Sequence, residues 1–343
     1  MAVGFVTSPL HVGHCVEGHP EGPERLEAVL ALLEESGVLD RMLRLEPRDA
    51  TDEELSWVHP AAFVEALERA CREGGGWADP DTYIVPGSCA AARQSAGACL
   101  EAIEAVLSGG VRSAFSAVRP PGHHARPAQA MGFCLMNNVA VAARFGQRRH
   151  GLERVAIVDI DVHHGNGSQD VFYDDPSVLY VSTHQYPFYP GTGPAQEIGA
   201  GAGRGANVNI PLPARSGDAE CAAAFEQVVE PVVRRFRPEL LLVSCGFDAH
   251  FADPLAGMSL SVDGYGALTQ RLIALADGLC AGRIVFALEG GYHLTALPWG
   301  VRRVIELLLG ETPAPDPLGL PADVARAPDV TPLLAEVRAL HGL

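Results

Sequence analysis

The stretch VAIVDIDVHHGNG, residues 155–167, runs from an apolar strand into a group of side chains that bind metals well. In a β-strand, alternate side chains point to the same side. Asp159, Asp161 and His163 are therefore expected on one side, while the valine and isoleucine residues between them point into packing. Three polar groups on a buried face cost free energy unless something neutralises them, as a divalent cation does. A hydrogen-bonded Asp–His cluster without a metal is the alternative that this segment alone leaves open.

Short apolar runs alternate along the chain with longer stretches of helical periodicity. Several runs are almost wholly apolar, as expected for strands of a parallel sheet that is covered on both faces. This alternation predicts a three-layer α/β/α fold with a mainly parallel sheet. The expected strands are 3–7, 111–118, 154–163, 177–183, 239–246 and 283–289. The expected helices are 23–36, 60–72, 88–108, 137–148, 218–236, 263–280 and 296–309.

Length and composition predict one compact domain. The chain has 343 residues and no linker-like segment in its middle, so we expect a single domain over 1–343. Its core is expected over about 19–310, and a Pro-rich loop with a short final helix is expected over 311–343.

The charge and the N-terminus restrict the possible partners. The formal net charge is −17, and all 25 basic residues are arginine. This acidity disfavours binding to nucleic acid and is compatible with cationic substrates. We find no secretory signal and no apolar run that is long enough to cross a membrane. The eight cysteines form no CxxC pair, so we expect free thiols and a cytoplasmic location, with no membrane partner and a homo-oligomer left open.

Polar clusters follow four of the predicted strands. RPPGHHA (119–125), GFDAH (246–250) and EGGYH (289–293) each come after an apolar run, as the opening stretch does. The carboxyl ends of parallel strands lie at one edge of a sheet, and sites form in the crevice beyond them. The four clusters together therefore predict one site.

Asp161, His163 and Asp248 are the candidate metal ligands. Two carboxylates and one imidazole leave coordination positions open for water and a substrate oxygen, which is typical of a catalytic site. Oxygen-rich ligation suits Zn²⁺, and it also suits Fe²⁺, Co²⁺ or Mn²⁺.

The remaining polar residues predict hydrolytic chemistry. His123 and His124 follow a rigid turn, and one could act as general base while the other acts as acid or electrostatic partner. Each needs an orienting group on its other ring nitrogen, and Asp159 and Asn166 are suitably placed. Tyr292 follows two glycines and could donate to a carbonyl oxygen as it becomes an oxyanion.

Taken together, these motifs resemble the zinc-dependent histone deacetylase family, within the arginase/deacetylase superfamily. The asparagine of DVHHGNG, the MGFC segment and LEGGY resemble its class II branch and the bacterial histone-deacetylase-like amidohydrolases. The resemblance covers about residues 19–310. The matching segments are HPEGPERLEAV (19–29), RPPGHHA, MGFCLMNNVA (131–140), DIDVHHGNG, PGTG (190–193), GFDAHFADPLAG and LEGGYHL.

The resemblance implies hydrolysis of N-acyl amides, chiefly of acetyl-lysine in peptides, proteins or small molecules. It implies one zinc ion on the three candidate ligands and a base role for His123, which His124 assists. Asp159 and Asn166 would support this pair, and Tyr292 would polarise the acyl carbonyl. It also implies a narrow substrate tunnel lined by Gly132, Phe133, Tyr189, Leu255, Gly290 and Gly291. A structural potassium ion is implied at Asp159, Asp161, His163 and Ser182.

Two other functions stay open. Acetylpolyamine amidohydrolases share the chemistry, but polyamine specialists tend to carry an acidic gatekeeper at the rim, where this chain has Leu255. A catalytically inactive protein that binds acylated ligands is the further alternative. Arginase relatives use a second Asp for a two-metal site, and His250 stands at that position here, which favours one metal.

Several further histidines have no firm assignment. We expect His250 at the rim of the site rather than on the metal. We expect His11, His14 and His19 in a solvated loop, and the role of His293 is open.

Overall fold

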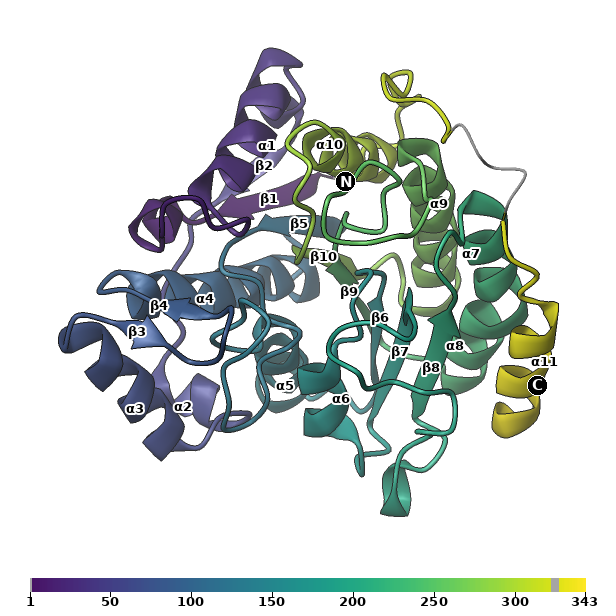
Figure 1. Ribbon diagram of the computed structural model, residues 1–343, viewed down its shortest axis with the longest axis horizontal. Helices are drawn as coiled ribbons and strands as arrows, with labels where there is room; N and C mark the ends of the chain where they lie inside the picture. The colour runs from purple at the N-terminus through teal and green to yellow at the C-terminus, as the bar shows by residue number, and fades with distance from the viewer. Residues whose placement is uncertain (1, 322–326) are drawn as a thin grey trace.

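The computed structural model describes residues 2–321 and 327–343, which fold around one eight-stranded sheet (Figure 1). The strand order is β2-β1-β5-β10-β9-β6-β7-β8, and all neighbouring strands run parallel. The strands are β1 (Val3–Thr7), β2 (Leu43–Leu45), β5 (Ser113–Ala117), β6 (Val155–Asp159), β7 (Val178–Gln185), β8 (Asn207–Leu212), β9 (Leu240–Cys245) and β10 (Ile284–Leu288). A separate antiparallel hairpin joins β3 (Gly76–Trp77) to β4 (Tyr83–Ile84).

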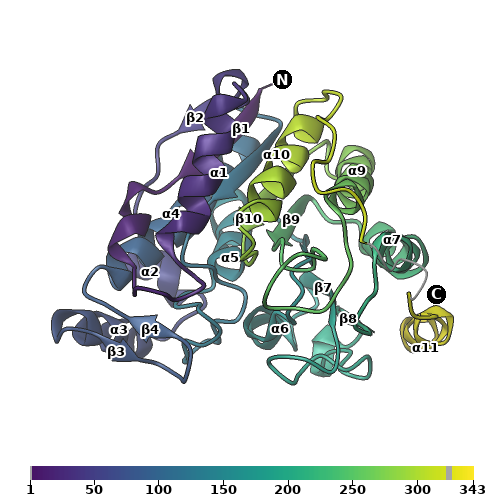
Figure 2. The same cartoon turned by 45° about the horizontal axis from the view of Figure 1, so that its top comes forward.

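Helices cover both faces of the sheet, as predicted. On one face lie α1 (Pro23–Glu35), α7 (Asp218–Ala224), α8 (Glu230–Phe236), α9 (Val262–Leu279), α10 (Ala296–Leu308) and α11 (Thr331–His341). On the other lie α2 (Asp52–Ser56), α3 (Ala61–Arg72), α4 (Ser88–Leu107), α5 (Asn138–His150) and α6 (Asn166–Phe172). Figure 2 shows α1, α10 and α9 side by side.

The central strand β6 shows why the sheet is buried on both sides. Val158 packs into the core beneath α1, α9 and α10, and its neighbour Ile157 packs into the core beneath α4 and α5. Both side chains are 0% exposed, and burial of such a side chain contributes about 1.5–3 kcal/mol. A strand with two apolar faces therefore has its polar residues only at its end.

Some predicted boundaries differ from the structure. Strand β6 ends at Asp159 instead of residue 163, so Asp161 and His163 lie in the bend that follows it. The predicted helix over 218–236 is interrupted by a π-helical turn at Phe225–Val229. Pro231 has no N–H to donate to the preceding turn, and a widened turn accommodates that loss. The predicted final helix is present as α11, while residues 322–326 of the C-terminal segment lie outside the described residues.

The sequence patterns missed two strands of the main sheet and the hairpin. Strand β2 has three residues, all at least partly exposed, so it carries no apolar run. Strand β8 contains two asparagines and Pro211. Both strands lie at the edges of the sheet, where such residues are tolerated. Among the described residues, no helix combines the length and the apolar character that a membrane crossing requires.

A buried ion-pair network ties the N-terminal segment to the sheet. The Glu21 carboxylate accepts hydrogen bonds from Nη2 of Arg119 at 2.7 Å and from Nη1 of Arg25 at 3.0 Å. All three side chains are at most 1% exposed. Nε of Arg25 also donates to the carbonyl of Gly291 at 2.6 Å. Helix α1 is thereby fixed to the loop that follows β10.

We predict that Glu21→Gln destabilises the protein at neutral pH by on the order of 3 kcal/mol, because it leaves two buried guanidinium groups without their carboxylate. Although burial opposes the charge, Arg119 and Arg25 lower the pKa of Glu21 from 4.5 to about 2. The unfolded chain therefore takes up the proton first as the pH falls. The stabilisation is complete above pH 4.5 and is lost as the pH falls towards 2.

Urea unfolding of the wild type and the variant at pH 7 and at pH 3 measures this effect. The matched control is Glu153→Gln, which removes a carboxylate that is 79% exposed and should change stability by less than about 1 kcal/mol. A Glu21 variant as stable as this control at pH 7 would contradict the prediction.

Candidate active site

The four polar clusters lie at the carboxyl ends of β5, β10, β9 and β6, which are consecutive in the sheet. His123 and His124 follow β5, Asp161 and His163 follow β6, Asp248 follows β9 and Tyr292 follows β10. The structure therefore brings the residues singled out in the sequence to one edge of the sheet.

Three of these side chains form a compact set of metal-binding donors. Nδ1 of His163 lies 3.2 Å from Oδ1 of Asp161 and 3.2 Å from Oδ2 of Asp248. The candidate ligand atoms of the three residues all lie within 4.8 Å of one another. The backbone N–H groups of Val162 and Gly290 donate to Asp248 and Asp161, which holds both carboxylates in place. Two carboxylates and an imidazole facing one point fit a divalent cation.

The two buried carboxylates of this set also make a nearby positive charge energetically favourable. Burial raises the pKa of Asp248 to about 7, with the neighbouring Asp161 adding to the effect. Although burial opposes its charge, hydrogen bonds that the His163 ring donates to Asp161 and Asp248 raise its pKa to about 10. In the absence of another cation, the site therefore favours a proton on His163, which a metal ion would replace.

The two adjacent histidines have different partners. Nδ1 of His123 lies 3.0 Å from Oδ2 of Asp159, and the Tyr180 hydroxyl donates to the same oxygen at 2.9 Å. Nδ1 of His124 lies 2.8 Å from the amide oxygen of Asn166. Burial disfavours charge on both rings. The carboxylates of Asp161 and Asp159 outweigh it and raise the pKa of His123, whereas burial and the nearby His123 charge lower the pKa of His124.

A cavity of about 210 Å³ leads to these groups. Phe133 and Tyr292 meet edge to face in its wall, with ring centroids 5.7 Å apart, and Phe188 stacks on His163. The wall is largely aromatic and apolar, which suits an extended aliphatic chain. Its lining residues are Asp81, His124, Gly132, Phe133, His163, Phe188, Tyr189, Leu255 and Tyr292.

Four of the six predicted tunnel residues lie in this wall, namely Gly132, Phe133, Tyr189 and Leu255. Gly290 and Gly291 instead lie behind it, beside the donor set and against Phe247. A Cβ on Gly290 would lie 2.1 Å from Oδ2 of Asp248, so the chain passes too close to the carboxylates for any side chain. Phe188 and Asp81 were not predicted.

Three residues that support the site also escaped the sequence analysis. The Arg25 guanidinium lies over the Tyr292 ring at 4.8 Å from its centroid. Oδ2 of Asp253 accepts the backbone N–H of Tyr292 at 2.6 Å. Oε2 of Glu289 accepts the N–H groups of Gly122 and His123, at 2.6 and 3.1 Å. Of the three, only the burial of Arg25 could have been predicted from the sequence. Arg25 stands four residues before the core residue Val29 on α1, so both side chains lie on the buried face of the helix.

The expectation of a solvated loop for the N-terminal histidines is wrong for two of them. His14 is 1% exposed and stacks on Tyr83 at 4.3 Å, and His11 is 6% exposed. His19 is partly buried, and its Nε2 lies 3.0 Å from the carbonyl of Asp81 at the cavity. His19 also meets the cavity residue Phe133 edge to face, with ring centroids 4.8 Å apart.

The two histidines near the other loops are not part of the donor set. His250 was expected at the rim but is buried, with 2% exposure, because it packs against Phe251 with ring centroids 4.4 Å apart. Nδ1 of His293 accepts the backbone N–H of Ala296 at the start of α10.

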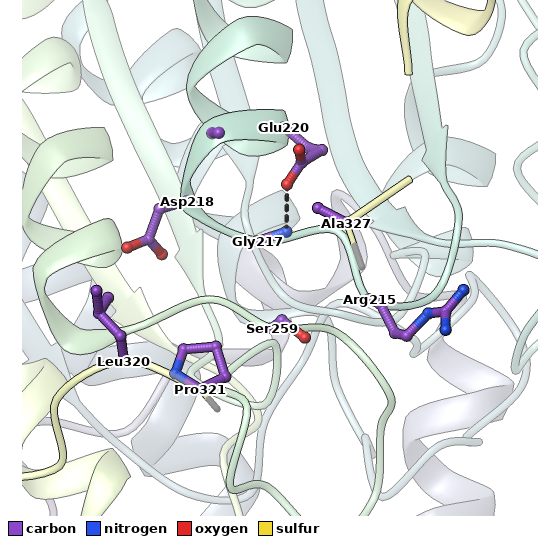
Figure 3. Close-up of a pocket in the computed structure, with 9 residues that line it drawn as sticks. Arg215, Gly217, Asp218, Glu220, Ser259, Leu320, Pro321 and Ala327 are labelled. Atoms are coloured by element: carbon purple, nitrogen blue, oxygen red, sulfur yellow. Dashed lines mark hydrogen bonds between the residues drawn. The ribbon is translucent and has the colours of Figure 1, made fainter. Parts of the chain in front are cut away.

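Figure 3 shows a second pocket, of about 310 Å³, where α7 begins beside the C-terminal segment. Glu220 accepts the N–H of Gly217 there, and Asp218 is engaged with Ser261. Its described lining residues include no histidine or cysteine. The candidate site residues His124, His163 and Tyr292 line the first cavity instead.

Comparisons with known proteins agree with this geometry. Residues 19–308 match the model of the histone deacetylase domain family. A probable deacetylase of Archaeoglobus fulgidus is 42% identical over 85% of this chain and 82% of its own length. A histone deacetylase-like amidohydrolase of Pseudomonas aeruginosa is 44% identical over 85% of this chain and 77% of its own length. The chain belongs to the histone deacetylase domain family and is a hydrolytic deacetylase.

Two further relatives locate it among class II-like enzymes. The human polyamine deacetylase HDAC10 is 43% identical over 86% of this chain, which spans 45% of the human protein. The crystal structure of the HDA15 HD domain superposes with a TM-score of 0.90 at 38% identity and covers 99% of this chain and 94% of that one. The predicted α/β fold of the arginase/deacetylase type is thereby confirmed.

We predict that Gly290→Ala weakens binding of a divalent cation, with Zn²⁺ as the probe, by at least about tenfold, because the new methyl group would displace the Asp248 carboxylate. The control is Gly278→Ala in α9, where an added Cβ meets no atom within 4 Å. Competition with a chromogenic chelator measures the zinc affinity of both variants without any turnover. Equal affinities would show that the close approach at Gly290 does not restrict the donor set.

Proposed function

We propose that the chain is a zinc-dependent amidohydrolase that removes acetyl or other acyl groups from N-ε-acyl-lysine. One observation supports this most strongly: three metal-type donors and a pair of oriented histidines meet at the end of a narrow, aromatic-lined cavity. The substrate would be an acylated peptide, protein or small molecule. We further propose a cytoplasmic enzyme with one catalytic domain over residues 1–343.

Asp161, His163 and Asp248 would hold one Zn²⁺, and Fe²⁺ or Co²⁺ would suit the same donors. When bound, the ion would supply Lewis-acid chemistry, polarising an acyl carbonyl and activating water for attack on it. The buried carboxylates would lose their repulsion, and His163 would be neutral.

His124 is the better candidate for proton transfer, which reverses the roles that the sequence suggested. His124 lines the cavity, whereas His123 lies behind it between Asp159 and Asp161. His123 therefore suits a permanently charged role, stabilised by its carboxylates. Nδ1 of His124 pairs with the neutral amide of Asn166, so this ring would take a proton from water and return it to the departing amine.

Tyr292 is positioned to stabilise negative charge on the acyl oxygen. Its ring stands in the cavity wall, held by Arg25 over its face and by Asp253 at its backbone. These contacts fix the phenol before the substrate arrives, and a preorganised donor acts most strongly on charge that develops during the reaction.

Residues of the same bend would also hold a structural potassium ion. Asp159 and Ser182 are register partners on β6 and β7, and the chain continues from Asp159 to Asp161 and His163. Oxygen atoms of these four residues are the donors that we propose for it, together with backbone carbonyls.

We predict that Tyr292→Phe lowers kcat by about 10²–10³-fold on an acetyl-lysine peptide, while zinc content stays unchanged. The wild type should lose activity to a chelator and regain it with Zn²⁺. Steady-state kinetics and metal analysis of the same samples measure both. Undiminished turnover by the phenylalanine variant would remove this role from Tyr292, and activity that resists chelation would contradict the metal dependence.

The roles of the two histidines are tested by comparing kcat of the variants His124→Ala and His123→Ala. The loss of kcat should be larger for His124→Ala, which removes the group that faces the cavity. The opposite order would restore the assignment of His123 as base.

An acetylpolyamine is the second candidate substrate, and Asp81 favours it. Asp81 lines the cavity, where its carboxylate would attract a cationic substrate, and the protein carries a net charge of −17. The apolar Leu255 in the same wall favours acyl-lysine.

We predict that the wild type has a higher kcat/KM for an acetyl-lysine peptide than for N-acetylspermidine. Leu255→Glu should raise kcat/KM for the polyamine about fivefold, which is the effect of one exposed ion pair of about 1 kcal/mol. Leu255→Gln is the control, since it removes the apolar group without adding charge. A wild type that prefers acetylspermidine would support the hypothesis that the substrate is an acetylpolyamine.

A further inference from the structure

Two cysteines meet where α3 ends and α4 begins. Cys71 lies in the last turn of α3, and Cys89 is the second residue of α4. Their sulfur atoms are 2.7 Å apart, which approaches the bond length of a disulfide, about 2.05 Å. Figure 1 shows the β3–β4 hairpin beside these two helices.

This pair is more accessible to solvent than the thiols of the core, although Cys15 is more exposed still. Cys71 and Cys89 are 6% and 9% exposed and line an open hollow of about 430 Å³ together with Glu68, Arg72, Pro86 and Ala90. Cys99, Cys134 and Cys245 are at most 1% exposed. A small oxidant can therefore reach the pair from outside without entering the core.

The hydrogen bond between the two thiols favours reaction at one of them. It lowers the pKa of Cys71 to about 7 and raises the pKa of Cys89. The thiolate is the reactive form of cysteine, so Cys71 carries a substantial thiolate fraction at neutral pH.

We propose that Cys71 and Cys89 form a reversible disulfide when a peroxide is present. The Cys71 thiolate attacks one peroxide oxygen, the O–O bond breaks, and Cys71 becomes a sulfenic acid while the other oxygen leaves as water after taking up a proton. The Cys89 sulfur then attacks the Cys71 sulfur, the S–O bond breaks, and a second water leaves. Two thiols and one hydrogen peroxide thus give one disulfide and two waters, and a dithiol reductant reverses the change.

The disulfide would close a ring around the segment 72–88, which reaches the mouth of the cavity. Asp81 from this segment lines the cavity, and the Thr82 hydroxyl accepts the backbone N–H of Phe133 at 3.0 Å. The residues from Arg72 to Gly76 are largely exposed, so a crosslink would restrain a segment that few contacts hold. Its effect on substrate binding rests on the proposed function, whereas the formation of the disulfide does not.

Peptide mapping of the full-length protein tests the proposal. The protein is treated with hydrogen peroxide, its remaining thiols are alkylated, and it is digested with trypsin without a reductant. Trypsin cuts only after arginine here, because the chain has no lysine. We expect peptide 70–72 linked to peptide 73–93, and we expect this pair to vanish after treatment with dithiothreitol. Separately alkylated Cys71 and Cys89 over the whole peroxide titration would overturn the proposal.

Three variants and a melting curve complete the test. Cys15→Ser, which removes the exposed thiol, should leave the linked peptides intact. Cys71→Ser and Cys89→Ser should each abolish them. Oxidation should raise Tm of the wild type by several degrees, reversibly, and leave Tm of these two variants unchanged. A rise in Tm that is equal in the Cys89 variant would assign the effect to other oxidation and overturn the proposal.

Activity is read separately on the same oxidised samples. If the disulfide-closed segment 72–88 restrains the cavity mouth, oxidation changes KM for an acetyl-lysine peptide more than it changes kcat. Dithiothreitol should then restore the original KM. An unchanged KM in protein that carries the linked peptides would overturn this coupling. Because the peptide map needs no turnover, failure of the disulfide and failure of the deacetylase function are distinguishable.

Discussion

Four carboxylates are buried at the carboxyl edge of the sheet, and the need to compensate them organises the site. Asp159, Asp161, Asp248 and Glu289 are all 0% exposed. An isolated carboxylate in such surroundings costs several kcal/mol, so each needs a donor or a positive charge. Glu289 is compensated by backbone N–H groups, Asp159 by an imidazole and a phenol, and Asp161 and Asp248 share His163. Only the last two still face a point where a cation fits.

A second buried network gives the first its rigidity. Arg25 reaches from α1 to the carbonyl groups of Glu289 and Gly291, and its guanidinium covers the ring of Tyr292. Glu21 balances its charge together with that of Arg119. The loop after β10 therefore cannot shift without disturbing a desolvated ion pair. In the role proposed for Tyr292, its phenol would gain from this arrangement, because a fixed donor needs no reorganisation during the reaction.

The parts of this molecule that followed from sequence are those governed by local periodicity. The alternation of β6 and the strand-end position of Asp161, His163 and Asp248 rest on the geometry of parallel strands, which one segment reveals. Asp253 and Glu289 act on backbone N–H groups of distant loops, and such partners leave no pattern in a single chain. The burial of His14 likewise depends on Tyr83, 69 residues away in sequence. The edge strands were not predicted for different reasons: β2 is short and at least partly exposed throughout, and the apolar run of β8 is interrupted by buried asparagines and Pro211.

The two histidines differ because one is paired with an aspartate and the other with an asparagine, which carries an NH₂ group in place of one carboxylate oxygen. Asp159 and Asn166 both present a side-chain oxygen to an Nδ1 atom, at 3.0 and 2.8 Å, so both fix a ring in place. Only the aspartate also stabilises positive charge. Two adjacent imidazoles with ring centroids 4.0 Å apart repel each other when both are protonated, so the proton that Asp159 holds on His123 keeps His124 neutral. In the proposed mechanism Asn166 would therefore leave His124, the ring that faces the cavity, free to accept a proton.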